Sequence, residues 1–193
     1  PNHPAILKHL GLATQSYRYF NEITCQVDFD SMKNDLSQAK SGDILLLHGC
    51  CHNPTGANLV ASQWDEITNI CLQKHITPLI DIAYQGFGDG LEQDVAGLRS
   101  MALRVPDMML AASCSKNFGV YRDRVGAAIV VTKERATAKL AEDNLKSLNR
   151  LTFSFPPDHG AAIVELILTD TNLKKQWSNE LENMRKGMLS LRL

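Results

Sequence analysis

One stretch decides the fold: MMLAASCSKNFG, residues 108–119. Its first five residues are apolar and have the length of a buried strand, and the polar segment that follows them carries Lys116. Most lysines are solvated surface charges. A lysine directly behind a buried strand, however, lies where open α/β sheets bind their ligands, and its amine can form an imine with an aldehyde. The stretch therefore predicts a buried strand and a candidate reactive lysine.

Three more apolar runs of strand length occur in the chain, at residues 44–47, 77–80 and 127–131. Helical spacing of apolar residues follows Ser62, the candidate N-cap of one helix, and recurs over residues 95–102. Continuous apolar strands that alternate with helices are typical of a parallel sheet covered by helices. We therefore predict an α/β fold with a mainly parallel sheet flanked by helices, in which residues 127–131 form a fourth strand that is apolar on both faces.

After Thr132, apolar residues recur at helical spacing, and this pattern predicts three helices in the rest of the chain. The last of them, from residue 173, is still in phase where the sequence stops, and the first residues include no initiator Met. No repeat, low-complexity tract or linker divides the chain. We expect one unit over residues 1–193, cut at both ends.

Composition narrows the functional classes. The chain has 193 residues with 44% apolar content, enough for one sizeable core. Twenty basic and 21 acidic side chains nearly cancel, so we expect no nucleic-acid or membrane-surface partner. No apolar run approaches the roughly 20 residues that span a bilayer. Five irregularly spaced cysteines indicate reduced thiols in a cytoplasmic protein. Histidines and cysteines at positions 48–52 are adjacent in the chain and point to opposite faces, so no metal site is expected.

Three polar residues lie at the ends of successive predicted strands. Asn53 follows the first strand, Asp81 ends the second and Lys116 follows the third. These side chains have the chemical types that a pyridoxal ring requires. Lys116 would hold the aldehyde carbon, and Asp81 would keep the ring nitrogen protonated. Asn53 and Tyr84 would donate to the phenolic oxygen. Together they indicate a pyridoxal phosphate site.

A phosphate ligand is also present, because Arg124 follows Lys116 by eight residues and can offer a bidentate fork to an anion. Ser113 and Ser115 add hydroxyls nearby. Taken singly, each candidate has a structural alternative: Arg124 as half of a surface ion pair, Asp81 and Asn53 as turn residues, Tyr84 as a core residue. The alternatives leave the coincidence of all four unexplained.

These segments resemble a known family. The motifs HGCCHNPTG (48–56), DIAYQGF (81–87), SCSKNFG (113–119) and RVG (124–126) are similar to those of class I aminotransferases, in the subgroup that acts on aspartate and aromatic amino acids. The resemblance spans the whole chain. It implies the large, cofactor-binding domain of a fold-type I pyridoxal-phosphate enzyme, with the last helix leading toward a small domain. By resemblance, the site residues are the imine lysine Lys116, the pyridinium partner Asp81, its backing histidine His3, the phenolic-oxygen partners Asn53 and Tyr84, and the phosphate ligands Ser113 and Arg124.

The resemblance also bears on substrates and partners. Arg150 matches the family arginine that enters the neighbouring subunit's site to pair with a substrate carboxylate, which implies a homodimer with shared sites; its alternative is a helix C-terminal cation. Asn53 is the other expected substrate contact. Phe155 stands where aspartate-specific members usually have Asn, so an enzyme limited to aspartate is not expected.

We therefore predict pyridoxal-phosphate-dependent transamination between aromatic amino acids or aspartate and 2-oxoglutarate, with Lys116 as the proton shuttle. The family's phosphate loop, ring-stacking aromatic and α-carboxylate arginine would lie outside this chain, so the chain alone is expected to be inactive. Two alternatives stay open: a lyase of the same fold, which would share Lys116 but not need Arg150, and an inert fragment that only dimerises.

Overall fold

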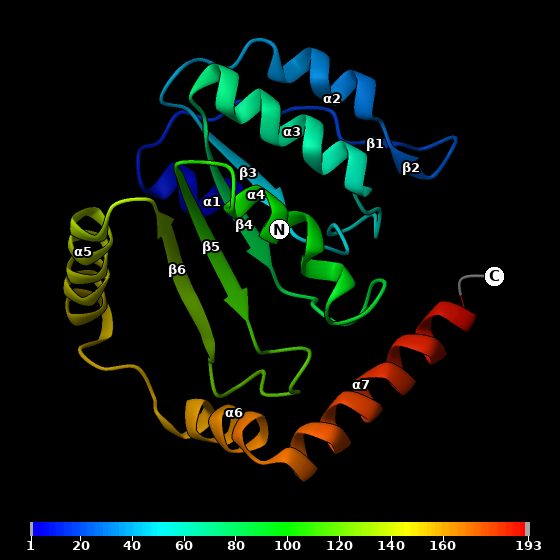
Figure 1. Ribbon diagram of the computed structural model, residues 1–193, viewed down its shortest axis with the longest axis vertical. Coiled ribbons are helices and arrows are strands. Elements are labelled where there is room, and N and C mark those ends of the chain that lie inside the picture. Colours follow the sequence, from blue (N-terminus) through cyan, green and yellow to red (C-terminus); the bar gives the residue numbers. More distant parts are fainter. Residues whose placement is uncertain (1, 192–193) are drawn as a thin grey trace.

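A four-stranded sheet forms the centre of the molecule, in the order β3-β4-β5-β6 (Figure 1). The computed structural model describes residues 2–191. Their elements are α1 (His3–His9), β1 (Phe20–Asn21), β2 (Gln26–Val27), α2 (Phe29–Leu36), β3 (Ile44–His48), α3 (Ala61–Lys74), β4 (Thr77–Ile82), the 3₁₀ turn η1 (Gln93–Val95), α4 (Ala96–Ala102), β5 (Asp107–Ser113), β6 (Gly126–Thr132), α5 (Arg135–Phe153), α6 (His159–Thr169) and α7 (Thr171–Ser190).

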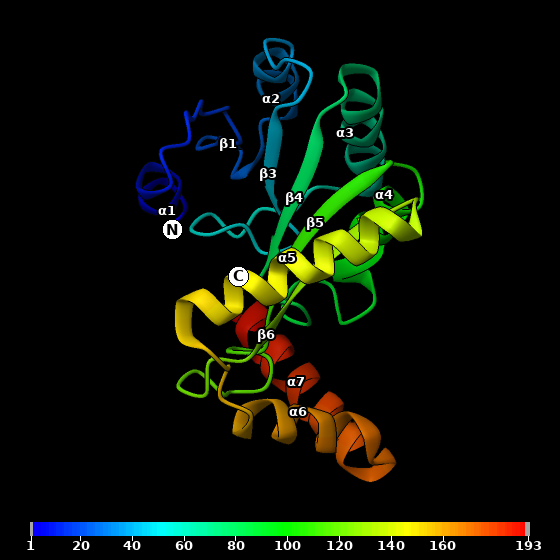
Figure 2. The same cartoon turned by 90° about the vertical axis from the view of Figure 1, so that its left-hand side faces the viewer.

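The first three strands of the sheet are parallel, as predicted, because helical segments connect them. Leu45 of β3 pairs with Pro78 of β4, and Leu79 of β4 pairs with Met109 of β5. The predicted helices between them are present, and α3 and α4 pack together on one side of the sheet while α1 lies on the other (Figure 2). Helix α3 begins at Ala61, so the prediction of Ser62 as its N-cap is wrong.

The fourth strand departs from the prediction. β6 runs antiparallel to β5, and its first four residues are exposed. The connection between the two strands contains no helix, so the chain turns back beside β5 instead of crossing over to continue parallel. The close pairing needs a glycine at Gly126, because a Cβ atom there would lie 2.4 Å from the carbonyl oxygen of Ala112.

The core lies between α3, α4 and the sheet. Ile67 and Ile80 are fully buried, and Leu47 is 1% exposed. Burying one such side chain contributes about 1.5–3 kcal/mol. Helix α4 approaches closely, because Gly97 leaves room for the Trp64 ring, which a Cβ atom would meet at 2.3 Å. This packing holds the carboxyl ends of three parallel strands in a fixed arrangement.

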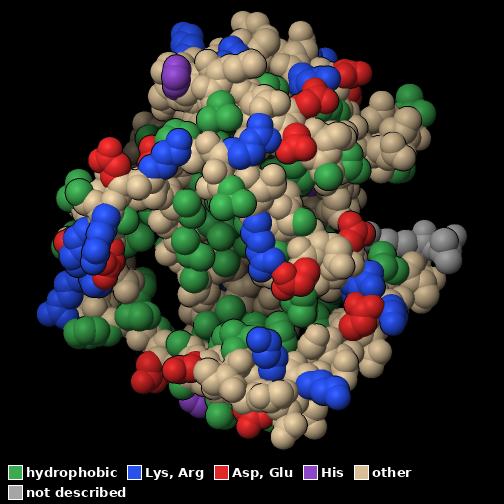
Figure 3. Space-filling model, in the orientation of Figure 1, with side chains coloured by type: hydrophobic (Ala, Val, Ile, Leu, Met, Phe, Trp, Pro, Cys, Tyr) green, Lys and Arg blue, Asp and Glu red, His purple; other side chains and the backbone are tan. Residues whose placement is uncertain are grey.

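The three C-terminal helices curve around the sheet, with α5 packed against β6 and α6 against α7 (Figure 1). No residue of α5 is buried in this chain. Hydrophobic side chains gather in the hollow between the sheet and these helices (Figure 3). Among residues 2–191, no helix has both the length and the apolar character needed to cross a membrane.

Candidate active site

A cavity of about 500 Å³ opens at the carboxyl ends of β3, β4 and β5. It forms there because parallel strands bring their ends to the same edge of the sheet. The structure brings together seven of the residues predicted from the sequence. Those that line the cavity are His3, Asn53, Asp81, Tyr84, Ser113, Lys116 and Arg124.

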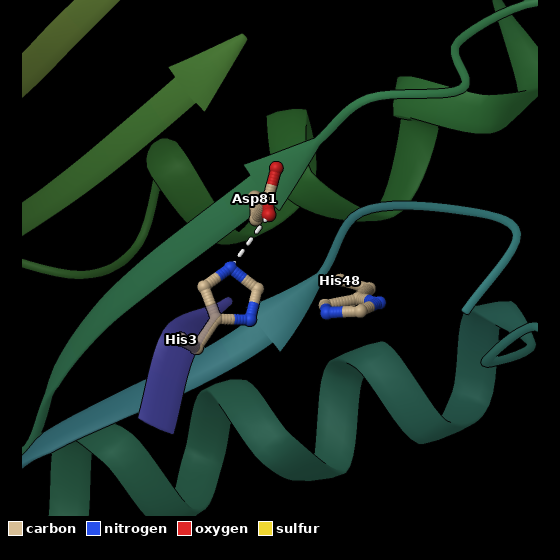
Figure 4. Close-up of side chains that lie close together, drawn as sticks. All are labelled: His3, His48 and Asp81. Atoms are coloured by element: carbon tan, nitrogen blue, oxygen red, sulfur yellow. Dashed lines mark hydrogen bonds and ion pairs between the residues drawn. The ribbon is translucent and has the colours of Figure 1, made fainter. Parts of the chain in front are cut away.

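Asp81 is the next-to-last residue of β4 and is bonded to His3, the first residue of α1. The distance between His3 Nε2 and Asp81 Oδ2 is 2.7 Å (Figure 4). Both side chains are partly exposed, at 26% and 30%. The contact expected between these two residues is therefore present. It engages one carboxylate oxygen of Asp81 and fixes the orientation of the group at the cavity.

His48, which the sequence analysis did not assign to the site, ends β3 directly beside Asp81 in the strand register. Its Nδ1 accepts the backbone N–H of Asn53 at 3.1 Å, and its ring lies edge-on to His3 with centroids 5.4 Å apart (Figure 4). Burial lowers the pKa of His48, although the nearby Asp81 carboxylate opposes the shift. A neutral ring matches its role as acceptor. Its position at the end of a predicted strand was visible in the sequence, but its place beside Asp81 follows only from the strand register.

The spacing of these three residues would also allow a metal ion, since one ligand atom from each of His3, His48 and Asp81 lies within 4.8 Å of the others. His3 Nε2 is bonded to Asp81, however, and His48 Nδ1 accepts from Asn53. These bonds already fix the rings and the carboxylate around the cavity, an arrangement that suits the support of a ligand ring.

Lys116 enters the cavity from the loop after β5. Its Nζ lies 4.8 Å from the centroid of the Tyr84 ring, a cation–π contact. The residues on either side of it, Ser115 and Asn117, are 5% and 7% exposed. Trp177 of α7 donates its indole N–H to the Asn117 carbonyl at 2.7 Å. Buried neighbours and a helix contact thus hold the backbone that carries the lysine.

Hydrogen-bond donors gather at the Arg124 end of the cavity. The Ser115 backbone N–H donates to Ser113 Oγ at 3.2 Å, and Arg124 Nη1 donates to the Tyr121 carbonyl at 3.0 Å and to Ser115 Oγ at 3.4 Å. Arg124 has a φ of 55°, in the left-handed region that non-glycine residues rarely adopt. Two hydroxyls and a guanidinium in this arrangement can bind an anion such as phosphate.

The loop after Tyr84 is organised by Asp94, a residue that the sequence analysis missed. The Asp94 side chain accepts three backbone N–H bonds, from Gly86 at 2.7 Å, Gly88 at 3.1 Å and Asp89 at 2.7 Å. Asp94 is only 7% exposed. The glycine-rich sequence suggests a flexible loop, whereas the structure ties it to one buried carboxylate. No periodicity or motif singles out Asp94 in advance.

Arg150 lies outside this cavity, near the end of α5. Its guanidinium carbon is 5.2 Å from the centroid of the Phe155 ring, and Nη1 donates to Ser154 Oγ. Within this chain it therefore does not join the other candidate residues. Its expected contact with a substrate in a neighbouring subunit stays a prediction.

The donors fit a pyridoxal ring and its phosphate. Lys116 offers an amine and Asp81 a carboxylate on the same cavity, and Ser113 and Arg124 supply anion ligands at one end. Asn53 and Tyr84 add polar groups between them. This combination at the strand ends of an open α/β sheet defines the class of pyridoxal-phosphate enzymes.

Comparison with known proteins narrows the class to a family. The family model described as aminotransferase class I and II matches residues 1–192. This chain belongs to that family, whose members depend on pyridoxal phosphate.

Similar proteins include two with curated names. The aromatic-amino-acid aminotransferase of Paracoccus denitrificans is 55% identical over 100% of this chain and 49% of that protein. The aspartate aminotransferase of Escherichia coli is 40% identical over 100% of this chain and 48% of that protein. The chain thus spans about half the length of the curated relatives that it matches.

Solved structures agree with the sequence relatives. An aromatic-amino-acid aminotransferase from Burkholderia pseudomallei, covalently bound to pyridoxal phosphate, matches with a TM-score of 0.96 at 37% identity, over 99% of this chain and 48% of that one. An aromatic amino acid aminotransferase with 3-indolebutyric acid matches with a TM-score of 0.97 at 55% identity, over 100% of this chain and 49% of that one.

Proposed function

We propose that this chain supplies the cofactor-holding part of a pyridoxal-phosphate-dependent aminotransferase that acts on aromatic amino acids and aspartate, with 2-oxoglutarate as amino acceptor. One observation carries the proposal: Lys116 and Asp81, from different strand ends, line a single cavity. The names of the relatives support aromatic and dicarboxylic substrates. The five cysteines form no disulfide among residues 2–191, and reduced cysteines are typical of the cytoplasmic location that we propose.

In this proposal, the chain's own residues hold the cofactor at three places. The amine of Lys116 would hold it at the aldehyde carbon, Asp81 would support its ring nitrogen, and Ser113 and Arg124 would bind its phosphate. When bound, the cofactor supplies an electron sink for the electrons left on the substrate Cα after its proton departs.

Each residue then has a defined chemical task. The carboxylate of Asp81, oriented by His3, would stabilise a proton on the ring nitrogen. Tyr84 and Asn53 would donate hydrogen bonds to the phenolic oxygen. The amine of Lys116 would take the α-proton of the substrate at Nζ as a base and would then deliver it to the cofactor carbon as an acid.

Substrate choice and assembly extend the proposal beyond this cavity. Arg150 would pair with a side-chain carboxylate in the partner's site, and Asn53 would contact the substrate in its own. Exposed apolar residues on α5 and α6 support a contact with a second subunit, as surfaces of this kind mark interfaces; they include Leu140, Leu148, Leu151 and Leu166. A homodimer with shared sites would bring Arg150 to its substrate.

The test uses the intact protein with pyridoxal phosphate. Lys116→Ala should abolish both the visible absorption band of the bound cofactor and amino transfer to 2-oxoglutarate, whereas the exposed Lys133→Ala should preserve both. A borohydride-reducible adduct in Lys116→Ala would refute the assignment. Release of ammonia, without amino transfer, would favour the lyase alternative. Failure of the wild-type protein to bind the cofactor would favour an inert fragment.

A further inference from the structure

Three aromatic rings lie in a row beside the turn that contains Asn53. The Tyr19 and His52 rings stack with centroids 4.2 Å apart and an interplanar angle of 29°. The His52 and His48 rings follow at 4.7 Å and 32°. At the end of the row, His48 Nδ1 accepts the backbone N–H of Asn53. The position of His48, and hence that of the Asn53 backbone, therefore depends on His52 and Tyr19.

A second set of bonds joins His52 to the same turn. Its Nδ1 lies 2.9 Å from Thr55 Oγ1, and that hydroxyl accepts the backbone N–H of Ala57 at 3.2 Å. The His52 carbonyl accepts the N–H of Gly56 at 2.6 Å. Tyr19 closes the set, because its hydroxyl donates to the Ala57 carbonyl at 3.1 Å. His52 is thus connected to the turn on both sides of Asn53.

The electrostatics of the row agree with this geometry. Burial, with a smaller contribution from His48, lowers the pKa of His52 to about 4. The ring is therefore neutral near pH 7, and its Nδ1 is free to accept a hydrogen bond from the Thr55 hydroxyl. Burial also raises the pKa of the neighbouring Tyr19 to about 12, so its phenol keeps the proton that it donates to Ala57. Neutral rings can stack without repulsion between like charges.

We propose that His52 is a positioning residue, which acts through His48 and Thr55 to hold Asn53 against the cavity that contains Lys116 and Tyr84. The inference rests on the proposed function, because Asn53 is there a ligand of the cofactor. Asn53 borders that cavity and also a second one, of about 310 Å³, which Lys116 and Tyr84 line as well. A small displacement of the turn would therefore change where its amide points.

A double-mutant cycle on the intact protein tests the inference, with the dissociation constant of pyridoxal 5′-phosphate, followed by its absorbance, as the readout. His52→Leu should raise this constant about tenfold, as loss of a supporting residue typically does, and Asn53→Ala should raise it at least as much. If His52 acts through Asn53, the double variant should bind no more weakly than Asn53→Ala alone. Independent effects that multiply would overturn the inference.

Thr55→Val provides a milder variant that preserves the volume of the side chain, so it separates positioning from misfolding. It should raise the dissociation constant severalfold and also be non-additive with Asn53→Ala; an unchanged constant would overturn the inference. Tyr17→Phe is the matched control, since Tyr17 donates a comparable bond to the Leu46 carbonyl outside the row, and it should leave the constant unchanged.

If wild type and Asn53→Ala differ but His52→Leu binds like wild type, only the positioning role fails. If the wild type does not bind the cofactor, the proposed function itself fails.

Discussion

The carboxylate of Asp94 provides a test of how the loop after Tyr84 is held in place. Oδ2 accepts the N–H groups of Gly86 and Gly88, and Oδ1 accepts that of Asp89. In Asp94→Asn, one carboxylate oxygen becomes an NH₂ group. At least one of the three bonds is then lost, because the new NH₂ donor faces a backbone N–H donor. A hydrogen bond to a charged group contributes about 1.5–3 kcal/mol and a neutral one about 0.5–1.5 kcal/mol. One lost bond of about 1.5–3 kcal/mol and two bonds weakened by about 1–1.5 kcal/mol each predict a loss of about 3.5–6 kcal/mol in the free energy of unfolding.

Urea unfolding followed by circular dichroism measures this loss. Asp89→Asn is the matched control, because Asp89 is an exposed residue in the same loop. Replacing its carboxylate with an amide changes the net charge by the same amount as Asp94→Asn. We expect the control to stay within about 0.5 kcal/mol of wild type. A loss of similar size in both variants would mean that net charge matters rather than the three bonds. An Asp94→Asn variant as stable as wild type would refute the reasoning about the loop.

Three further predictions address the chemistry, the specificity and the pH dependence. Asp81→Asn should retain the cofactor but slow abstraction of the α-proton by several orders of magnitude, because an amide cannot keep the ring nitrogen protonated; near-normal single-turnover rates would show that another group sets the ring electronics. Arg150→Leu should lower kcat/KM for aspartate about tenfold or more while sparing phenylalanine, from loss of a charge-assisted pair of about 1.5–3 kcal/mol. Lys146→Leu on the same helix should leave both values unchanged, and an equal fall for both substrates in Arg150→Leu would make Arg150 structural. His52 takes up its proton near pH 4 when folded instead of 6.5, so its contribution to stability is complete above pH 6.5 and is lost as the pH falls toward 4. His52→Phe should therefore show a shallower drop in thermal stability across that window than wild type, and an equal slope would contradict the assigned shift.

The strands and the main catalytic candidates could be predicted because both leave local signals. Apolar runs mark the buried strands, and polar residues just beyond them mark the edge where ligands bind. Lys116, Asp81 and Asn53 follow this rule, and the structure places all three around one cavity. The direction of β6 could not be predicted from its apolar residues. An edge strand with one exposed face can have the same apolar composition as a central strand that is buried on both faces.

Residues that support the site from behind were missed for a different reason. Asp94 acts through three backbone N–H groups, which have no sequence signature, and the role of His48 depends on the register of two strands. Trp177 is 60 residues from its partner Asn117. Each of these contacts exists only after the chain has folded, so composition and periodicity carry no information about them.

Helix α7 connects the two loops that carry Lys116 and Tyr84. Trp177 stacks on Phe118 with centroids 4.4 Å apart, in the loop that contains Lys116. One turn later, Leu181 is 1% exposed and packs against Gly86, where a Cβ atom would come within 2.5 Å of it. After another turn, Arg185 donates to the Gly88 carbonyl at 3.2 Å.

The spacing of these three helix residues, four positions apart, places them on one face of α7. That face contacts both loops at once, so α7 cannot shift along its axis without disturbing the backbone on either side of the Lys116–Tyr84 contact. The relative position of the lysine and the phenol is therefore set by the C-terminal helix as well as by the sheet. The three residues on this face of α7 each meet a different chemical surface: Trp177 meets a ring, Leu181 a glycine and Arg185 a carbonyl oxygen.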